Sequence, residues 1–159
     1  MELAPKLMNR IPYKFTILPP SKYNQTSYNM NKIKAIMHNE VLSEMDKLNL
    51  EKSYVVVDKF CEPLIYFRYL AKNSNVYKGI TFTPRAESKC LSVAASSIIA
   101  RYLFLKELEK MSKELKRPIP KGAGLLVDDF AKELVKEIGF TKLEKYVKLN
   151  FKNTDKIKK

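Results

Sequence analysis

The sequence has few cysteines and no long hydrophobic run, and these absences exclude several classes of protein. Of its 159 residues only Cys61 and Cys90 are cysteines, and no C-x-x-C spacing occurs. A disulfide framework and a zinc knuckle are therefore excluded, and the reducing cytoplasm is the expected compartment. The most apolar stretch, residues 91–105, is interrupted by serines and an arginine, so we expect no segment to cross a membrane.

Acidic residues are scarce relative to basic ones. Lys and Arg number 30 against 17 Asp and Glu, which gives a net charge of +13. Such a surplus favours a polyanionic partner, above all nucleic acid. Hydrophobic residues make up 45% of the chain, which is enough to form a core. Residues 140–159 carry seven lysines but only Glu144 and Asp155 as acids. This end is either a solvated tail or an arm that contacts phosphates.

Hydrophobic periodicity predicts three strands, at residues 13–18, 54–58 and 79–83. The first alternates apolar and polar residues and ends at two prolines. The second is a β-branched run, which is typical of a strand covered on both sides in the parallel part of an α/β sheet.

Four helices are predicted, over residues 31–48, 88–117, 127–138 and 141–144. The first turns Asn31, Lys34 and His38 away from a stripe of buried apolar residues: Ile33, Met37, Val41 and Met45. Ser88 is expected to cap the second helix, whose first half is apolar nearly all round and should be deeply buried. Three strands are too few to cover that helix, so the predicted α/β sheet is incomplete.

Two acidic residues stand where strands end. Asp58 follows the β-branched strand, and Glu87 follows the next strand just before the long helix. In open α/β sheets ligands gather beyond the carboxyl ends of strands, and two acids there could share Mg²⁺. From position alone, an Asp such as Asp58 after a strand is more often a turn or capping residue, and Glu87 in the first turn of a helix ordinarily compensates the helix dipole.

Four segments in a fixed order carry a family resemblance. They are residues 29–39 (NMNKIKAIMHN), 57–60 (VDKF), 85–102 (RAESKCLSVAASSIIARY) and 120–124 (PKGAG). Together they resemble the bacterial ribonucleases HIII, a branch of the type 2 ribonuclease H family. The match extends from the first residues to about Gly139, and its most specific part surrounds residues 94–101.

The resemblance implies an RNase H-like fold, with a mixed sheet flanked by helices. It also implies endonucleolytic hydrolysis of the RNA strand of RNA/DNA hybrids, with four carboxylates and Mg²⁺ or Mn²⁺ as the cofactor. Asp58 matches the third carboxylate of the family and Glu87 the fourth. Lys89, Arg101 and Lys121 are the candidates to contact the nucleic-acid backbone.

The sequence departs from the family pattern at its start. The family's first two carboxylates are an adjacent Asp-Glu pair on the first strand, and no such pair occurs here. The first three strands and the additional N-terminal substrate-binding domain are also missing. We therefore expect residues 1–139 to be the C-terminal part of a catalytic domain, followed by a short helix and basic tail at 140–159.

This departure bears on activity. Asp58 and Glu87 could hold one ion loosely, whereas two-metal hydrolysis needs two ions about 3.5–4 Å apart. The intact protein is expected to be a hybrid-specific ribonuclease, and this chain alone to be inactive or weakly active unless a separate chain supplies the missing strands. Apolar faces left uncovered should make it prone to aggregation or only partly folded.

Two other functions are compatible with the charge. The first is a non-catalytic basic module, or a remnant, that binds nucleic acid through phosphates and does not distinguish RNA from DNA. The second is a structural RNA protein such as a ribosomal protein. The β-branched strand that ends at Asp58 fits the second poorly, because phosphate binding does not require it.

Overall fold

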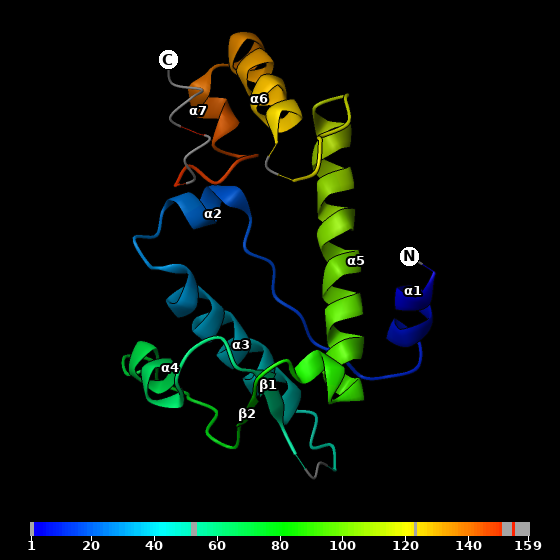
Figure 1. Cartoon of the computed structure of the whole chain (residues 1–159), viewed down its shortest axis with the longest axis vertical. Coiled ribbons are helices and arrows are strands. Elements are labelled where there is room, and N and C mark those ends of the chain that lie inside the picture. Colours follow the sequence, from blue (N-terminus) through cyan, green and yellow to red (C-terminus); the bar gives the residue numbers. More distant parts are fainter. Residues whose placement is uncertain (1, 52–53, 123, 151–153, 155–159) are drawn as a thin grey trace. The chain divides into compact units, whose positions relative to one another are not determined.

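The structure, a computed structural model, describes residues 2–51, 54–122, 124–150 and 154. The chain forms two compact units, drawn in Figure 1 with colours that follow the sequence. The first unit comprises Met1–Thr16 and Tyr28–Leu103, and the second comprises Ile17–Ser27 and Phe104–Lys159. Among the helices described, none has the combined length and apolarity that a membrane span requires.

A small parallel sheet belongs to the first unit. β1 (Val56–Asp58) pairs with β2 (Thr81–Thr83), and Val57 stands opposite Phe82. Both strands lie inside the predicted ranges and are parallel, so the predicted α/β fold is confirmed. In the described part of the chain the sheet has two strands, which is consistent with an incomplete sheet.

The strand predicted at residues 13–18 is wrong. These residues follow α1 (Leu3–Met8) as an irregular segment. The rings of Tyr13 and Phe15 stack on each other with centroids 6.2 Å apart. Alternation of apolar and polar residues produces a strand only where a neighbouring strand accepts its backbone hydrogen bonds, and among the described residues this segment has none.

Helix α4 (Pro63–Tyr69), which periodicity did not predict, supplies the aromatic core of the first unit. It begins at Pro63, whose fixed φ suits the first position of a helix. Its Tyr66 is fully buried and packs edge-on against three other rings, those of Phe60, Phe67 and Phe82. Ala35 and Leu70 complete the buried cluster. Burial raises the pKa of Tyr66 to about 12, so its phenol stays protonated.

Helix α3 (Met30–Asp46) packs against α4 and agrees with the predicted helix, but the predicted buried stripe is only partly right. Ile33, Ala35 and Asn39 are buried, whereas the other three residues of the stripe are half-buried: Met37, Val41 and Met45. The Asn39 amide donates to the Asn75 carbonyl and accepts from the Tyr77 N–H, both at 2.9 Å. A second contact surface, against the segment before β2, therefore shifts the buried face.

The α3 face opposite the predicted stripe covers the Phe60 ring. The His38 ring meets Phe60 edge-on with centroids 5.3 Å apart, and the Lys34 Nζ lies 5.4 Å from the Phe60 centroid. Burial, followed by the charge of Lys34, lowers the pKa of His38, while Asp58 opposes the shift. His38 is therefore neutral near pH 7.

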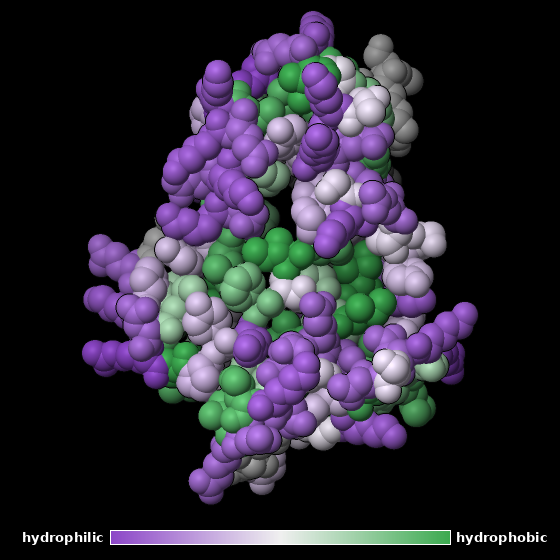
Figure 2. All heavy atoms as spheres, turned by 180° about the vertical axis from the view of Figure 1, so that it is seen from behind, coloured by the Kyte–Doolittle hydropathy of each residue, from purple (hydrophilic) through white to green (hydrophobic). Residues whose placement is uncertain are grey.

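The long helix is α5 (Leu91–Glu114), and the prediction that its first half is deeply buried is wrong. It begins three residues after Ser88, and within that half only Ala95 and Ile99 are buried. Leu91 is 87% exposed and Ile98 is 38% exposed. The two-stranded sheet is too small to cover these side chains, and Figure 2 shows hydrophobic residues reaching the surface among the hydrophilic ones.

In the second unit, Asn24 at the end of α2 (Pro20–Asn24) holds the segment that follows α7 (Phe140–Leu143). Its amide nitrogen donates to the carbonyls of Glu144 and Val147 at 3.0 and 2.9 Å, and its oxygen accepts from the Leu149 N–H at 2.9 Å. One side chain thereby satisfies three backbone groups more than a hundred residues away.

Arg117 joins the end of α5 to α6 (Leu125–Ile138). Its guanidinium pairs with Glu137 at 2.8 Å and lies 4.4 Å from the centroid of the Phe130 ring. The predicted 127–138 helix is confirmed, with Leu134 buried. Gly139 follows with a φ of 80°, a backbone conformation that favours glycine, as its predicted place after the helix requires.

Replacing Asn24 by Ala is expected to lower the free energy of unfolding by about 2 kcal/mol, because three half-buried backbone groups lose their partner. Urea denaturation followed by circular dichroism measures the loss. Gln25→Ala, which truncates the exposed amide next to it, is the control. Equal midpoints for the two variants would contradict the role of Asn24.

Stability should also fall on acidification as His38 gains a proton. The unfolded chain binds this proton near pH 6.5, whereas the folded chain binds it only at lower pH, so stability falls as pH falls below about 6.5. His38→Phe keeps a ring against Phe60 but does not titrate. The change in melting temperature between about pH 7.5 and about pH 5.5 should be smaller in this variant than in the unsubstituted chain. An unchanged difference would show that other groups cause it.

Candidate functional site

Asp58 is the last residue of β1 and is fastened to the turn that follows β2. Its Oδ1 accepts a hydrogen bond from the Ala86 N–H at 3.0 Å. The Lys59 N–H donates to the Thr83 carbonyl at 3.0 Å, which continues the pairing of the strands up to this point. Asp58 is half-buried, and Oδ1 is the carboxylate oxygen that takes part in this hydrogen bond.

Glu87 lies in that same turn, the 3-10 helix η1 (Ala86–Ser88). The turn is tight because Arg85 adopts a left-handed conformation, with φ 52° and ψ 47°. The Ser88 Oγ donates to the Arg85 carbonyl at 2.8 Å, so Ser88 closes this turn and does not cap α5 as the sequence predicts. Glu87 is exposed and directly follows Ala86, the residue that binds Asp58. The two acids are therefore delivered to the same end of the sheet.

His38 and Lys34 stand on the α3 side of this region. Burial and then the charge of Lys34 lower the pKa of His38, and the charge of Asp58 opposes this shift. The sequence offers no spacing that connects residue 38 with residue 58. This neighbourhood follows only from the packing of α3 against Phe60, two residues beyond Asp58.

The side chains at this end of the sheet offer two of the ligands that a divalent metal ion needs. Asp58 and Glu87 supply carboxylate oxygens, which Mg²⁺ and Mn²⁺ prefer as ligands. Among the described residues, however, no three His, Cys, Asp or Glu side chains come together in a group that could hold a metal ion. Two carboxylates fit one ion that keeps several waters, and they do not form the ligand set of a two-metal centre.

The three basic candidates are exposed and do not belong to one unit. Lys89 follows η1 and Arg101 lies on α5, both in the first unit, whereas Lys121 lies in the second. The Lys89 N–H donates to the Ala86 carbonyl at 3.0 Å, so this lysine is part of the turn that binds Asp58. Of the three, Lys89 is thus the nearest in sequence and in hydrogen bonding to the acids.

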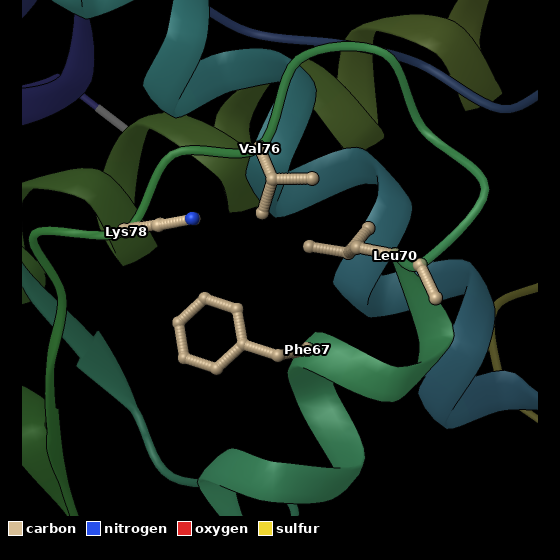
Figure 3. Close-up of a pocket in the computed structure, with 5 residues that line it drawn as sticks. Phe67, Leu70, Val76 and Lys78 are labelled. Atoms are coloured by element: carbon tan, nitrogen blue, oxygen red, sulfur yellow. The ribbon is translucent and has the colours of Figure 1, made fainter.

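An open pocket of about 290 Å³ lies elsewhere in the first unit, between the end of α4 and the segment before β2. Figure 3 shows the Phe67 ring, Leu70 and Val76 around it, with the Lys78 amine at one side. Its walls are mostly apolar and contain no acid. The pocket therefore has no part in a metal site at Asp58.

The chain is similar to a group of curated proteins. Ribonuclease HIII of Geobacillus sp. (strain WCH70) is 42% identical over 160 residues, which cover 97% of this chain and 53% of the relative. Ribonuclease HIII of Bacillus velezensis is 42% identical over 164 residues, which cover 100% of this chain and 52% of the relative. The chain thus spans about half the length of the curated relatives it matches.

Solved structures and a family model agree with this similarity. The crystal structure of Bst-RNase HIII in complex with Mn²⁺ is 36% identical, with a TM-score of 0.93 over 98% of this chain and 53% of that one. The fold is that of ribonuclease HIII, so the predicted RNase H-like fold is confirmed. The sequence model of the family described as Ribonuclease HII matches residues 1–154. Because that match includes nearly the whole chain, the chain belongs to the ribonuclease HII family.

Proposed function

We propose that this chain is the part of a ribonuclease H that contributes two metal-binding carboxylates to the hydrolysis of RNA in RNA/DNA hybrids. The observation that carries the proposal is the hydrogen bond from the Ala86 N–H to Asp58. It ties the end of a parallel strand to the turn that carries Glu87, which brings two carboxylates to the edge where α/β sheets bind ligands. Family membership and a relative crystallised with Mn²⁺ support it.

Each residue of the site has a distinct role in this proposal. Asp58 and Glu87 are the ligands for Mg²⁺ or Mn²⁺, which would activate a water and stabilise the leaving oxygen. The Ala86 N–H fixes the orientation of the Asp58 carboxylate. Lys89, Arg101 and Lys121 contact the phosphates of the hybrid.

The chain alone is expected to be inactive or weakly active. Its sequence has no adjacent Asp-Glu pair, and the described residues contain no third acid at the site. We infer that residues 1–139 are part of a catalytic domain, that 140–159 form a short helix and basic tail, and that a separate segment or chain supplies the remaining carboxylates. The free thiols of Cys61 and Cys90 favour the cytoplasm as its compartment.

A second function, binding of nucleic acid without catalysis, is favoured by the net charge of +13 and by the exposed basic candidates. A module of this kind would bind duplex DNA and RNA/DNA hybrid equally, with an affinity that falls steeply with salt. Asp58→Asn would then leave both metal binding and hybrid binding unchanged.

The metal site is tested by titrating the chain with Mn²⁺ and following the electron paramagnetic resonance signal of the free ion. Asp58→Asn should weaken binding by about ten-fold or more, because one of two carboxylate ligands is lost. Asp129→Asn, an exposed acid in the second unit, is the matched control and should bind as the unsubstituted chain does. Equal affinities for all three would contradict a site at Asp58.

Activity is tested with a labelled RNA strand in an RNA/DNA hybrid, in Mg²⁺ and in Mn²⁺. The chain alone is expected to give little or no cleavage, because the carboxylates at hand hold at most one ion. Metal-dependent cleavage that disappears in Asp58→Asn would instead mean that Asp58 and Glu87 suffice, and would overturn the incomplete site.

A further inference from the structure

The open pocket of about 290 Å³ at the end of α4 is built from two segments of the first unit. Its lining residues come from the end of α4, the turn after it and the segment before β2: Phe67, Leu70, Ala71, Val76 and Lys78. Figure 3 shows the Phe67, Leu70 and Val76 side chains around the hollow, with the Lys78 amine directed toward it. The pocket therefore offers solvent an apolar hollow with one cation at its side.

The pocket lies near the amino ends of the two strands, whereas the two acids lie beyond the carboxyl ends. β1 and β2 are parallel, with Asp58 as the last residue of β1 and Glu87 in the turn after β2. The chain leaves β1 at its carboxyl end, forms α4, and passes through residues 76–78 into the amino end of β2. A ligand in the pocket therefore leaves the carboxyl ends of the strands open, and metal binding at Asp58 does not account for the pocket.

The chain around the pocket is basic and carries no acid. Residues 63–86 contain no Asp or Glu, but they contain four basic residues: Arg68, Lys72, Lys78 and Arg85. Arg68 and Lys72 are exposed, and each directly follows a lining residue. Among the residues that the structure describes, the Lys78 amine has no ion-pair partner. The group that complements this region is therefore an anion.

Shape and lining favour one apolar side chain of a polypeptide as the occupant. A pocket of about 290 Å³ is at the lower end of the range for ligand sites, and small-molecule sites enclose most of their ligand, whereas this pocket is open. A single side chain needs only such partial enclosure, because the polypeptide that carries it stays outside. The Phe67 ring in the lining favours an aromatic side chain, since two rings attract each other in edge-on or offset geometry.

Nucleic acid suits this pocket less well, although the chain is basic. A nucleobase carries donors and acceptors along its edges, and the lining side chains other than Lys78 are apolar and offer them no partner. An unpaired polar group in apolar surroundings costs free energy, whereas the ring of a phenylalanine has no polar group to pair. An acidic peptide supplies an anion and an apolar side chain together, so it fits both features of the pocket.

We infer that this pocket is the docking site for an acidic peptide segment of a partner protein. An aromatic side chain of the segment enters the hollow against Phe67, and a neighbouring carboxylate pairs with the Lys78 amine. Arg68 and Lys72 attract the remaining acids of the segment and raise its rate of association. The docked segment leaves the end of β1 open, so the inference goes beyond the proposed function and does not depend on it.

The experiment measures binding of a synthetic peptide to the full chain by isothermal titration calorimetry. The probe is acetyl-Gly-Ser-Asp-Asp-Phe-Asp-Asp-Gly-amide, which has an aromatic side chain between acidic pairs. Ala71→Glu places an acid at the pocket and should weaken binding by about ten-fold or more, because it repels the peptide. Ala100→Glu is the matched control, since it changes the net charge equally at another exposed alanine of the first unit, and it should change the affinity less than about two-fold.

A second pair of variants tests the cation. Lys78→Gln removes the charge that faces the hollow and should weaken binding by about five-fold or more. Lys14→Gln removes an exposed lysine that does not line the pocket and should leave the affinity within about two-fold. A peptide with Ser in place of Phe should bind at least about ten-fold more weakly, because charge alone does not fill the hollow. Every substituted position in the chain is exposed, so the far-ultraviolet circular dichroism should not change.

Each of three results would overturn the docking site: no binding at about 1 mM peptide, equal effects of Ala71→Glu and Ala100→Glu, or equal binding of the Phe and Ser peptides. Two further results would assign the pocket to another occupant and overturn the inference as well. These are a dimer of this chain that Ala71→Glu dissociates, and a single-stranded DNA that Ala71→Glu selectively releases while the peptide does not bind. Mn²⁺ titration of Ala71→Glu should match that of the unsubstituted chain, so the test of the metal site at Asp58 stays separate.

Discussion

One hydrogen bond, from the Ala86 N–H to the Asp58 carboxylate, connects the two halves of the candidate site. It joins the end of β1 to the turn η1 that follows β2. Arg85 adopts a left-handed conformation in that turn, and Glu87, the residue after Ala86, is exposed. The position of both acids relative to the sheet depends on this contact, and so does any metal chemistry at its edge.

The aromatic cluster around Tyr66 supports that geometry from below the strands. Rings from α4, β2 and the loop after β1 pack edge-on, so β1 and β2 are held by side chains as well as by their short ladder. This explains how so small a sheet keeps its register. At the start of α5, by contrast, Leu91 is 87% exposed.

The family similarity and the local geometry support different statements about this chain. Membership in the ribonuclease HII family rests on a match to nearly the whole chain. The proposed chemistry rests on two carboxylates at one sheet edge, and the proposed need for more ligands rests on the missing Asp-Glu pair. The chain matches about half the length of its curated relatives, and in its described residues the sheet has two strands.

The sequence by itself determined the local features: the two strands, helices α3, α5 and α6, the glycine after α6, and the placement of Asp58 and Glu87 at strand ends. These follow from periodicity and from residues with strong backbone preferences, which act over a few positions. Tertiary structure alone decided that residues 13–18 are not a strand, that Ser88 closes a turn, that His38 packs against Phe60, and that Leu91 is exposed. Each of these depends on which distant segment is present to pair with or cover it, and no local pattern contains that information.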